Sequence, residues 1–171
     1  MSEKVKCHRC YIGVGSNLGD RFENINSSKN LLERTPEIRF YRNSSIYETE
    51  PSQIENVPDF YNCVFEIDTS LEAEELLKAL KDIEKKMGRN LNAVMESRII
   101  DLDILTYDSL TIKTRDLIIP HSRMHERLFV VAPLNELVPD FIHPVFNLKI
   151  SSLMEELQGS SRLERLTLIL E

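Results

Sequence analysis

Apolar and polar residues alternate most regularly where Ile100, Leu102 and Ile104 are separated by Asp101 and Asp103. A period of two predicts a β-strand with one buried face. Both carboxylates then project from the opposite face, with their Cα atoms about 6.6 Å apart, from about 3.3 Å of rise per residue. We therefore take this strand as the centre of the candidate chemistry.

Elsewhere in the chain, some segments show the same period of two, and others show the spacing of apolar residues that is typical of a helix. Asp20 is expected to cap the first helix, Thr69 and Glu72 to form a capping box at the second, and Gly88 to end that helix. Strands are predicted over residues 10–14, 38–47, 60–67 and 97–105, and helices over residues 21–33 and about 70–87.

The predicted order of elements is strand, helix, strand, strand, helix, strand. This order indicates an α+β protein with a ferredoxin-like βαββαβ core, in which a four-stranded antiparallel sheet packs both helices on one face. The other face would be free to carry a site. We expect a single domain over residues 1–171, with the core at about 10–107 and a C-terminal β/α extension at about 108–171.

Three glycines lie within and just after the first apolar run. Gly13, Gly15 and Gly19 are spaced one residue too widely for a dinucleotide-binding fingerprint, and no Lys-Ser/Thr pair follows as in a phosphate-binding P-loop. We interpret them as a tight strand-to-helix connection.

Composition narrows the class of partner. The 171 residues, 42% apolar and 29% charged, are typical of an ordinary globular domain, and the net charge of −7 argues against non-specific nucleic-acid binding. An anionic substrate would need clustered arginines or a metal. The first residues lack the apolar run of a signal peptide, and no apolar stretch suits a membrane span, so we expect a cytoplasmic monomer with no membrane partner.

The cysteines agree with a reducing compartment. Cys7 and Cys10 form a C-x-x-C pair without a matching second half, and Cys63 lies in a strand-like run. These sequences favour reduced thiols over a metal or redox site.

The Asp pair suits Mg²⁺, which takes one or two protein carboxylates and completes its shell with water and substrate phosphate. Arg98, three residues before Asp101, could grip a phosphate through two N–H groups. The alternative is an exposed polar face on an edge strand, with Arg98 pairing locally.

Short motifs in a fixed order resemble the 6-hydroxymethyl-7,8-dihydropterin pyrophosphokinase family of folate biosynthesis. The resemblance covers residues 11–144. Its motifs are YIGVGSNLGD from Tyr11, SIYET from Ser45, PDFYN from Pro58, IE followed by GR from Ile83, RIIDLDI from Arg98, IPH from Ile119 and RLF from Arg127.

The resemblance implies transfer of a pyrophosphoryl group from ATP to a reduced pterin, with two Mg²⁺ ions held by Asp101 and Asp103. The implied catalytic residues are Arg89, Arg98, Asp101 and Asp103, and the implied ATP-binding residues are Glu84, Arg89, Arg98, His121 and Arg127. Taken alone, His121 could be a turn residue after a proline, Arg89 a cation favoured by a helix C-terminus, and Glu84 part of an exposed helix face.

The pterin would be held by Thr49, Phe60, Asn62 and Phe129. A flat ring rich in donors and acceptors suits two aromatic faces and an amide at its edge. The alternative places Phe60 and Phe129 in the hydrophobic core.

Two loops depart from the family. Residues 90–96 contain no aromatic or basic side chain, and Glu50 stands where a proline is common. Because these loops close over substrates in the family, we expect an intact Mg²⁺ site with a weakened or differently built lid. The alternatives are a catalytically weak pterin- or nucleotide-binding homologue and another Mg²⁺-dependent transferase that uses a nucleotide.

Overall fold

The computed structural model describes residues 6–50, 58–88 and 98–170. The strands are β1 (His8–Ser16), β2 (Ile38–Asn43), β3 (Tyr47–Thr49), β4 (Phe60–Thr69), β5 (Asp101–Tyr107), β6 (Ile112–Lys113), β7 (Ile118–Ile119) and β8 (Leu163–Arg165). The helices are α1 (Arg21–Glu33), α2 (Ala73–Lys86), the 3₁₀ turn η1 (Met124–Glu126), α3 (Leu128–Leu137) and α4 (Ile150–Leu157).

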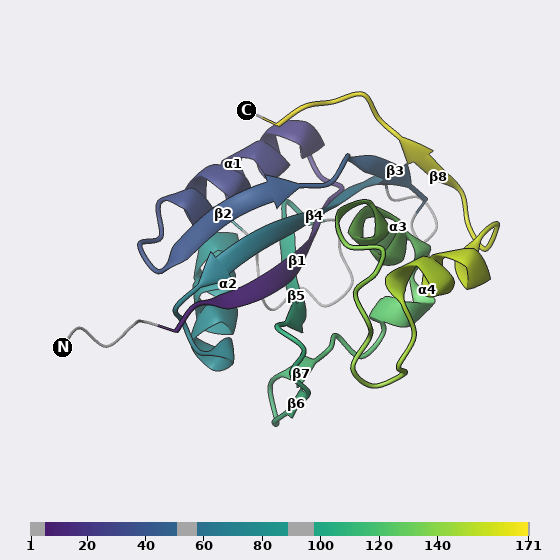
Figure 1. Cartoon of the computed structure of the whole chain (residues 1–171). Helices are drawn as coiled ribbons and strands as arrows, with labels where there is room; N and C mark the ends of the chain where they lie inside the picture. Colours follow the sequence, from purple (N-terminus) through teal and green to yellow (C-terminus); the bar gives the residue numbers. More distant parts are fainter. Residues whose placement is uncertain (1–5, 51–57, 89–97, 171) are drawn as a thin grey trace.

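The main sheet is antiparallel and has six strands in the described part of the chain. Its order is β5-β1-β4-β3-β8, with β2 pairing β4 beside β3, while β6 and β7 form a separate hairpin (Figure 1). The predicted α+β class with an antiparallel sheet is confirmed. The predicted count of four strands is wrong, for two reasons.

The first reason is a break in the strand predicted over residues 38–47. Ser44 donates its amide to the Val64 carbonyl at 2.9 Å, and the Ser44 hydroxyl accepts from the Val64 amide at 2.9 Å. Because a side-chain oxygen takes the position of a ladder carbonyl, the strand ends as β2 and resumes as β3. The second reason is β8, which is too short to show a sequence period and pairs with β3 at the edge of the sheet.

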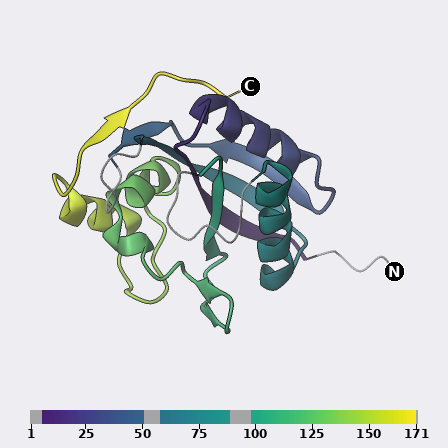
Figure 2. The same ribbon diagram turned by 180° about the vertical axis from the view of Figure 1, so that it is seen from behind.

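Helices cover both faces of the sheet. α1 and α2 pack on one face, behind the sheet in Figure 1 and in front of it in Figure 2, around Ile12, Val14, Leu76 and Leu80. The second face was expected to be free. Instead α3 and α4 cover part of it, because their apolar residues form another core with the sheet; this core includes Tyr11, Val64, Leu105, Val131 and Leu134.

The helix ends agree with the sequence in part. The Asp20 carboxylate accepts from the Glu23 amide at 3.0 Å, which confirms the cap of α1, and Gly88 follows α2 with φ of 90°. The capping box lies three residues later than predicted, since the Glu72 amide donates to Glu75 at 3.0 Å. Thr69 remains in β4 and donates its hydroxyl to the Glu37 carbonyl.

The three cysteines are free thiols, with Cys7 exposed and Cys10 and Cys63 in the core. Burial raises the pKa of the Cys10 and Cys63 thiols above the ordinary value. Among the described residues, no helix combines the length and the apolar character needed to cross a bilayer.

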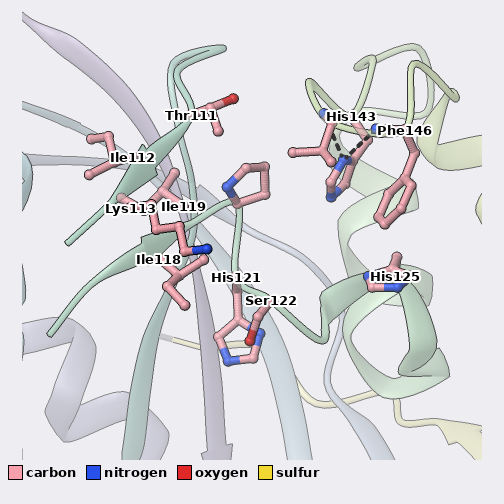
Figure 3. A pocket seen from close by; sticks show the side chains of 12 residues that line it. Thr111, Ile112, Lys113, Ile118, Ile119, His121, Ser122, His125, His143 and Phe146 are labelled. Carbon is pink, nitrogen blue, oxygen red and sulfur yellow. Dashed lines mark hydrogen bonds between the residues drawn. The ribbon is translucent and has the colours of Figure 1, made fainter. Parts of the chain in front are cut away.

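The loop between α3 and α4 is organised by His143, which is 2% exposed. Its Nδ1 accepts from the amides of Val145 and Phe146 at 3.3 and 3.4 Å, and its ring packs against Phe146 and His125 (Figure 3). Burial, and then the neighbouring His125, lower the pKa of His143 below 6.5. His143 is therefore neutral in the folded chain near neutral pH.

A lowered folded-state pKa makes His143 a source of acid sensitivity. The unfolded chain takes up the proton first as the pH falls below about 6.5, so folding stability is full above that pH and declines below it. The variant His143→Asn keeps an acceptor for the two amides and cannot titrate. We expect its free energy of unfolding to fall less steeply between about pH 6.5 and 5, by at most about 1.4 kcal/mol per pH unit. Urea unfolding at several pH values measures this slope, and equal slopes in both proteins would contradict the assignment.

Candidate functional site

The two aspartates lie on the same face of β5, as their alternation predicts. Leu102 and Ile104 face α1 and α2, while Asp101 and Asp103 are half-buried on the opposite face. In the ladder with β1, Asp101 lies opposite Gly15 and Asp103 opposite Gly13.

The register of the sheet aligns the Asp pair with residues predicted to bind the pterin. Gly15 on β1 lies opposite Asp101 on one side and Asn62 of β4 on the other. Two strand spacings of about 4.8 Å place Asp101 and Asn62 about 10 Å apart. The three positions form a row across the sheet, with a carboxylate at one end, an amide at the other and no side chain between them.

This position corrects the interpretation of the glycines. Gly13 and Gly15 lie inside β1, and of the three only Gly19, with φ of 66°, lies in the turn before α1. A Cβ on Gly15 would stand 3.0 Å from Asn62 Oδ1 and 3.8 Å from Phe60 Cδ1. Glycine is therefore needed there for a close approach.

Three of the four predicted pterin residues are adjacent. Asn62 Nδ2 donates to Thr49 Oγ1 at 2.7 Å, and both side chains are buried. This bond directs Asn62 Oδ1 toward Gly15, beside Phe60. Phe129 comes from α3, on the same side of the sheet, and is half-buried against the core there.

Basic side chains surround the Asp pair. Arg98 bonds to the Asp101 carboxylate, and Lys81 Nζ of α2 lies 3.9 Å from Asp103 Oδ1. Burial raises the pKa of Asp103, and the neighbouring Asp101 raises it further, while Lys81, His121 and Arg127 act in the opposite direction. The structure thus brings the predicted residues His121 and Arg127 within electrostatic range of both aspartates.

His121 is held by its backbone and by its ring. Its amide donates to the Leu105 carbonyl at 2.9 Å, and its Nδ1 accepts from the Arg123 amide at 3.2 Å. The neutral ring therefore carries its proton on Nε2. Burial lowers the pKa of His121, and Arg127 lowers it further, against the opposing effect of Asp103.

A cavity of about 220 Å³ borders His121. Apolar residues of the β6–β7 hairpin and of the loop around Phe146 line most of it, and Figure 3 shows His125 and His143 at its far wall. Neither aspartate lines this cavity, so the candidate site is the row of Asp101, Gly15 and Asn62 on the sheet.

Glu84 is not on an exposed helix face. It is 0% exposed, and its Oε1 accepts from the Leu102 amide at 2.7 Å and from Lys81 Nζ at 2.8 Å. Its carboxylate is thus directed at the backbone between the two aspartates. Arg89, residues 90–96 and residues 51–57 lie outside the described residues.

The donor set fits a hard divalent cation that shares its shell with a substrate. Among the described residues, no group of three or more His, Cys, Asp or Glu side chains forms a closed metal site. Two carboxylates on one face, with nearby cations for phosphate, match the preference of Mg²⁺ for few protein ligands. Asp101 and Asp103 are the residues that would hold it.

Sequence reasoning missed three contributors to this site. Asn17, in the turn after β1, accepts from the Arg98 amide at 2.6 Å and donates its own amide to the Arg98 carbonyl at 3.1 Å. Lys81 and Gly15 were also missed. Two glycines two residues apart in a strand pattern were the available signal for Gly15, whereas no local pattern links Asn17 or Lys81 to β5.

Comparisons with known proteins show one family. A family model described as 7,8-dihydro-6-hydroxymethylpterin-pyrophosphokinase matches residues 11–139. A Bacillus subtilis protein named 2-amino-4-hydroxy-6-hydroxymethyldihydropteridine pyrophosphokinase is 43% identical over 127 residues, covering 74% of this chain and 76% of its own length. An Aquifex aeolicus protein of the same name is 40% identical over 136 residues, covering 80% and 84%.

Other relatives are much longer. The Folic acid synthesis protein FOL1 of Dictyostelium discoideum is 44% identical over 138 residues, or 81% of this chain, which spans only 21% of that protein. A solved structure of Plasmodium falciparum HPPK-DHPS with pterin and p-hydroxybenzoate has a TM-score of 0.70 at 18% identity, covering 91% of this chain and 42% of that one. At this identity the likeness shows the fold.

The paired carboxylates predict a measurable cation site. In the presence of inorganic triphosphate, Asp101→Asn and Asp103→Asn are each expected to weaken Mn²⁺ binding by tenfold or more, about 1.4 kcal/mol, because each removes a charged oxygen ligand. Electron paramagnetic resonance of free Mn²⁺ measures the affinity. Asp116→Asn, on an exposed residue, is the control and should bind as the wild type does. Unchanged affinity in both site variants would place the cation elsewhere.

Proposed function

The chain belongs to the 7,8-dihydro-6-hydroxymethylpterin-pyrophosphokinase family, and we propose that it transfers pyrophosphate from ATP to the hydroxymethyl group of 6-hydroxymethyl-7,8-dihydropterin. The products are AMP and the pterin diphosphate, as in folate biosynthesis. The observation that carries this proposal is the row Asp101–Gly15–Asn62 across three adjacent strands. It offers a phosphate end and a heterocycle end about 10 Å apart, two strand spacings.

In this arrangement the protein positions two substrates and neutralises charge. The pterin hydroxyl oxygen forms a bond to the β-phosphorus of ATP and releases its proton to solvent, and the bond from that phosphorus to the oxygen kept by AMP breaks. Such transfers need alignment and electrostatic stabilisation more than covalent help from side chains. Gly15 lets the Asn62 amide oxygen lie close to the β1 backbone between the two ends.

The phosphate end is formed by Asp101, Asp103 and the cations around them. We assign Mg²⁺ to the aspartates, two ions by family resemblance; when bound, it would neutralise the triphosphate and polarise the transferred group. Arg98 supplies N–H donors beside Asp101. His121 and Arg127 would donate to the ATP phosphates, and Arg89 is assigned to the same end by resemblance alone.

The pterin end is formed by Asn62 and the aromatic residues. Asn62 Oδ1 accepts from the heterocycle, and the bond from its Nδ2 to Thr49 fixes its orientation. Phe60 and Phe129 would stack on the two faces of the ring. Their half-burial is consistent with side chains that also pack on the core.

We also propose a ferredoxin-like core, since β5, β1, β4 and the β2/β3 pair follow the order of that arrangement, with α3, α4 and β8 added to it. The whole would act as one domain and as a monomer in the cytoplasm, without a nucleic-acid partner. The net charge of −7 supports the absence of a nucleic-acid partner, and the free thiols support a reducing compartment.

The decisive test is AMP formation. With ATP, the reduced pterin and Mg²⁺, the wild type should release AMP rather than ADP, and omission of the pterin or of Mg²⁺ should abolish the product. Asp101→Asn and Asp103→Asn should lower kcat by at least about a hundredfold, because transition-state charge is left unneutralised. Chromatographic separation of AMP and ADP measures this. Binding of both substrates without AMP would instead identify a binding homologue.

The close approach of Asn62 to Gly15 predicts a selective effect on the pterin. Gly15→Ala places a Cβ 3.0 Å from Asn62 Oδ1, whereas Gly13→Ala meets the flexible Leu105 side chain at 3.1 Å. We expect Gly15→Ala to raise the KM for the pterin by about tenfold, since the amide oxygen must move, with a smaller change in the KM for ATP. Steady-state kinetics of both variants measures this, and equal effects of the two alanines would refute the role of Gly15.

A further inference from the structure

The strand that carries the Asp pair lies at the edge of the sheet. β5 pairs with β1 on one side, and β5 ends the order of strands on the other. Backbone N–H and C=O groups on an open strand edge require partners from water or from side chains. The partners at Leu102 decide how firmly the aspartates on either side of it are held.

Two side chains of α2 supply these partners. Glu84 Oε1 accepts from the Leu102 amide at 2.7 Å, and Lys81 Nζ donates to the Leu102 carbonyl at 3.2 Å. One acceptor and one donor thus take the place of a neighbouring strand, which the described residues do not supply on this side of β5.

The two side chains are also bonded to each other. Lys81 Nζ donates to Glu84 Oε1 at 2.8 Å, and their spacing of three residues places them on the same face of α2. Glu84 is fully buried, whereas the Lys81 side chain is 33% exposed. The Lys81 ammonium also lies 3.9 Å from Asp103 Oδ1. Lys81 therefore contacts Glu84, the Leu102 carbonyl and one of the two aspartates.

We propose that Lys81 and Glu84 are positioning residues that fix the backbone of Leu102 and thereby the directions of the Asp101 and Asp103 carboxylates. The proposal rests on the proposed function only in assigning the Asp pair to a cation and triphosphate. Outer partners of this kind orient metal ligands, and their loss typically weakens metal affinity ten- to a hundredfold.

The first experiment measures how firmly Lys81 and Glu84 hold the Leu102 backbone. Amide hydrogen exchange at Leu102, followed by nuclear magnetic resonance, should accelerate by at least about tenfold in Lys81→Met and in Glu84→Ala. Glu84→Ala removes the acceptor of the Leu102 amide, and Lys81→Met removes the ammonium that holds this acceptor in place. The amide of Ile12 in the central strand β1 should not accelerate. Lys81→Arg should preserve protection, and Lys78→Met, on an exposed residue of the same helix, is the control.

The second experiment separates positioning from simple charge. Removing a nearby ammonium would by electrostatics alone strengthen cation binding at Asp103. Positioning predicts the opposite: Lys81→Met and Glu84→Ala should weaken Mn²⁺ binding with inorganic triphosphate by ten- to a hundredfold, and Lys81→Arg should restore most of it. Tighter binding by Lys81→Met would overturn the proposal.

Activity supplies a third readout. In AMP formation, Lys81→Met should lower kcat while the KM for the pterin stays within about twofold, because the residues proposed to bind the pterin are unchanged. If Glu84→Ala does not fold, Glu84→Gln, which keeps the acceptor, should retain Leu102 protection while Lys81→Met loses it. Unchanged exchange and unchanged Mn²⁺ affinity in Lys81→Met would refute the proposal. Hydrogen exchange and Mn²⁺ binding do not require catalytic turnover. Their results therefore test the positioning role even if the proposed reaction is not observed.

Discussion

Hydrogen bonding of β1 along both of its edges is the constraint on which the site depends. β1 pairs with β4 from His8 opposite Thr69 to Ser16 opposite Tyr61, and with β5 through Asp101 opposite Gly15. A register shift of one residue would turn every side chain of a strand to the other face. The same register that buries Ile12 and Val14 against the helices therefore aligns Asp101, Gly15 and Asn62 on the opposite side.

The local charge around the aspartates differs from that of the chain. The protein carries a net charge of −7, yet Arg98 and Lys81 contact the Asp pair, and Arg127 acts on it electrostatically. The expectation that an anionic substrate would need local cations agrees with this arrangement. Partial burial strengthens these interactions, because charges removed from water are screened less than charges on the surface.

Much of the fold could be predicted from sequence because its elements have clear periods. The alternation at Asp101 and Asp103, the helix of residues 21–33 and the strand at Phe60 are local patterns, and the structure contains them all. What failed depended on contacts distant in sequence. Ser44 breaks a strand through Val64, and β8 exists only because β3 offers an edge.

The same reasoning applies to the site. The carboxylates were visible in the sequence, but Gly15 was assigned to a turn because its two strand partners come from residues far along the chain. Lys81 and Asn17 contact β5 and the segment before it only after the helices pack. Roles that arise from tertiary contact leave no period to detect.

The outer strand β2 has a consequence for how copies of the chain meet. Its ladder with β4 shifts register between Phe40 and Arg42, and Arg42 Nε donates to Glu66, its partner on the opposite strand, at 2.6 Å. A bulge bends and twists a strand, and arginines on an outer strand disfavour its pairing with a second sheet. Edge-to-edge aggregation is thus opposed at β2 by irregular geometry and by charge.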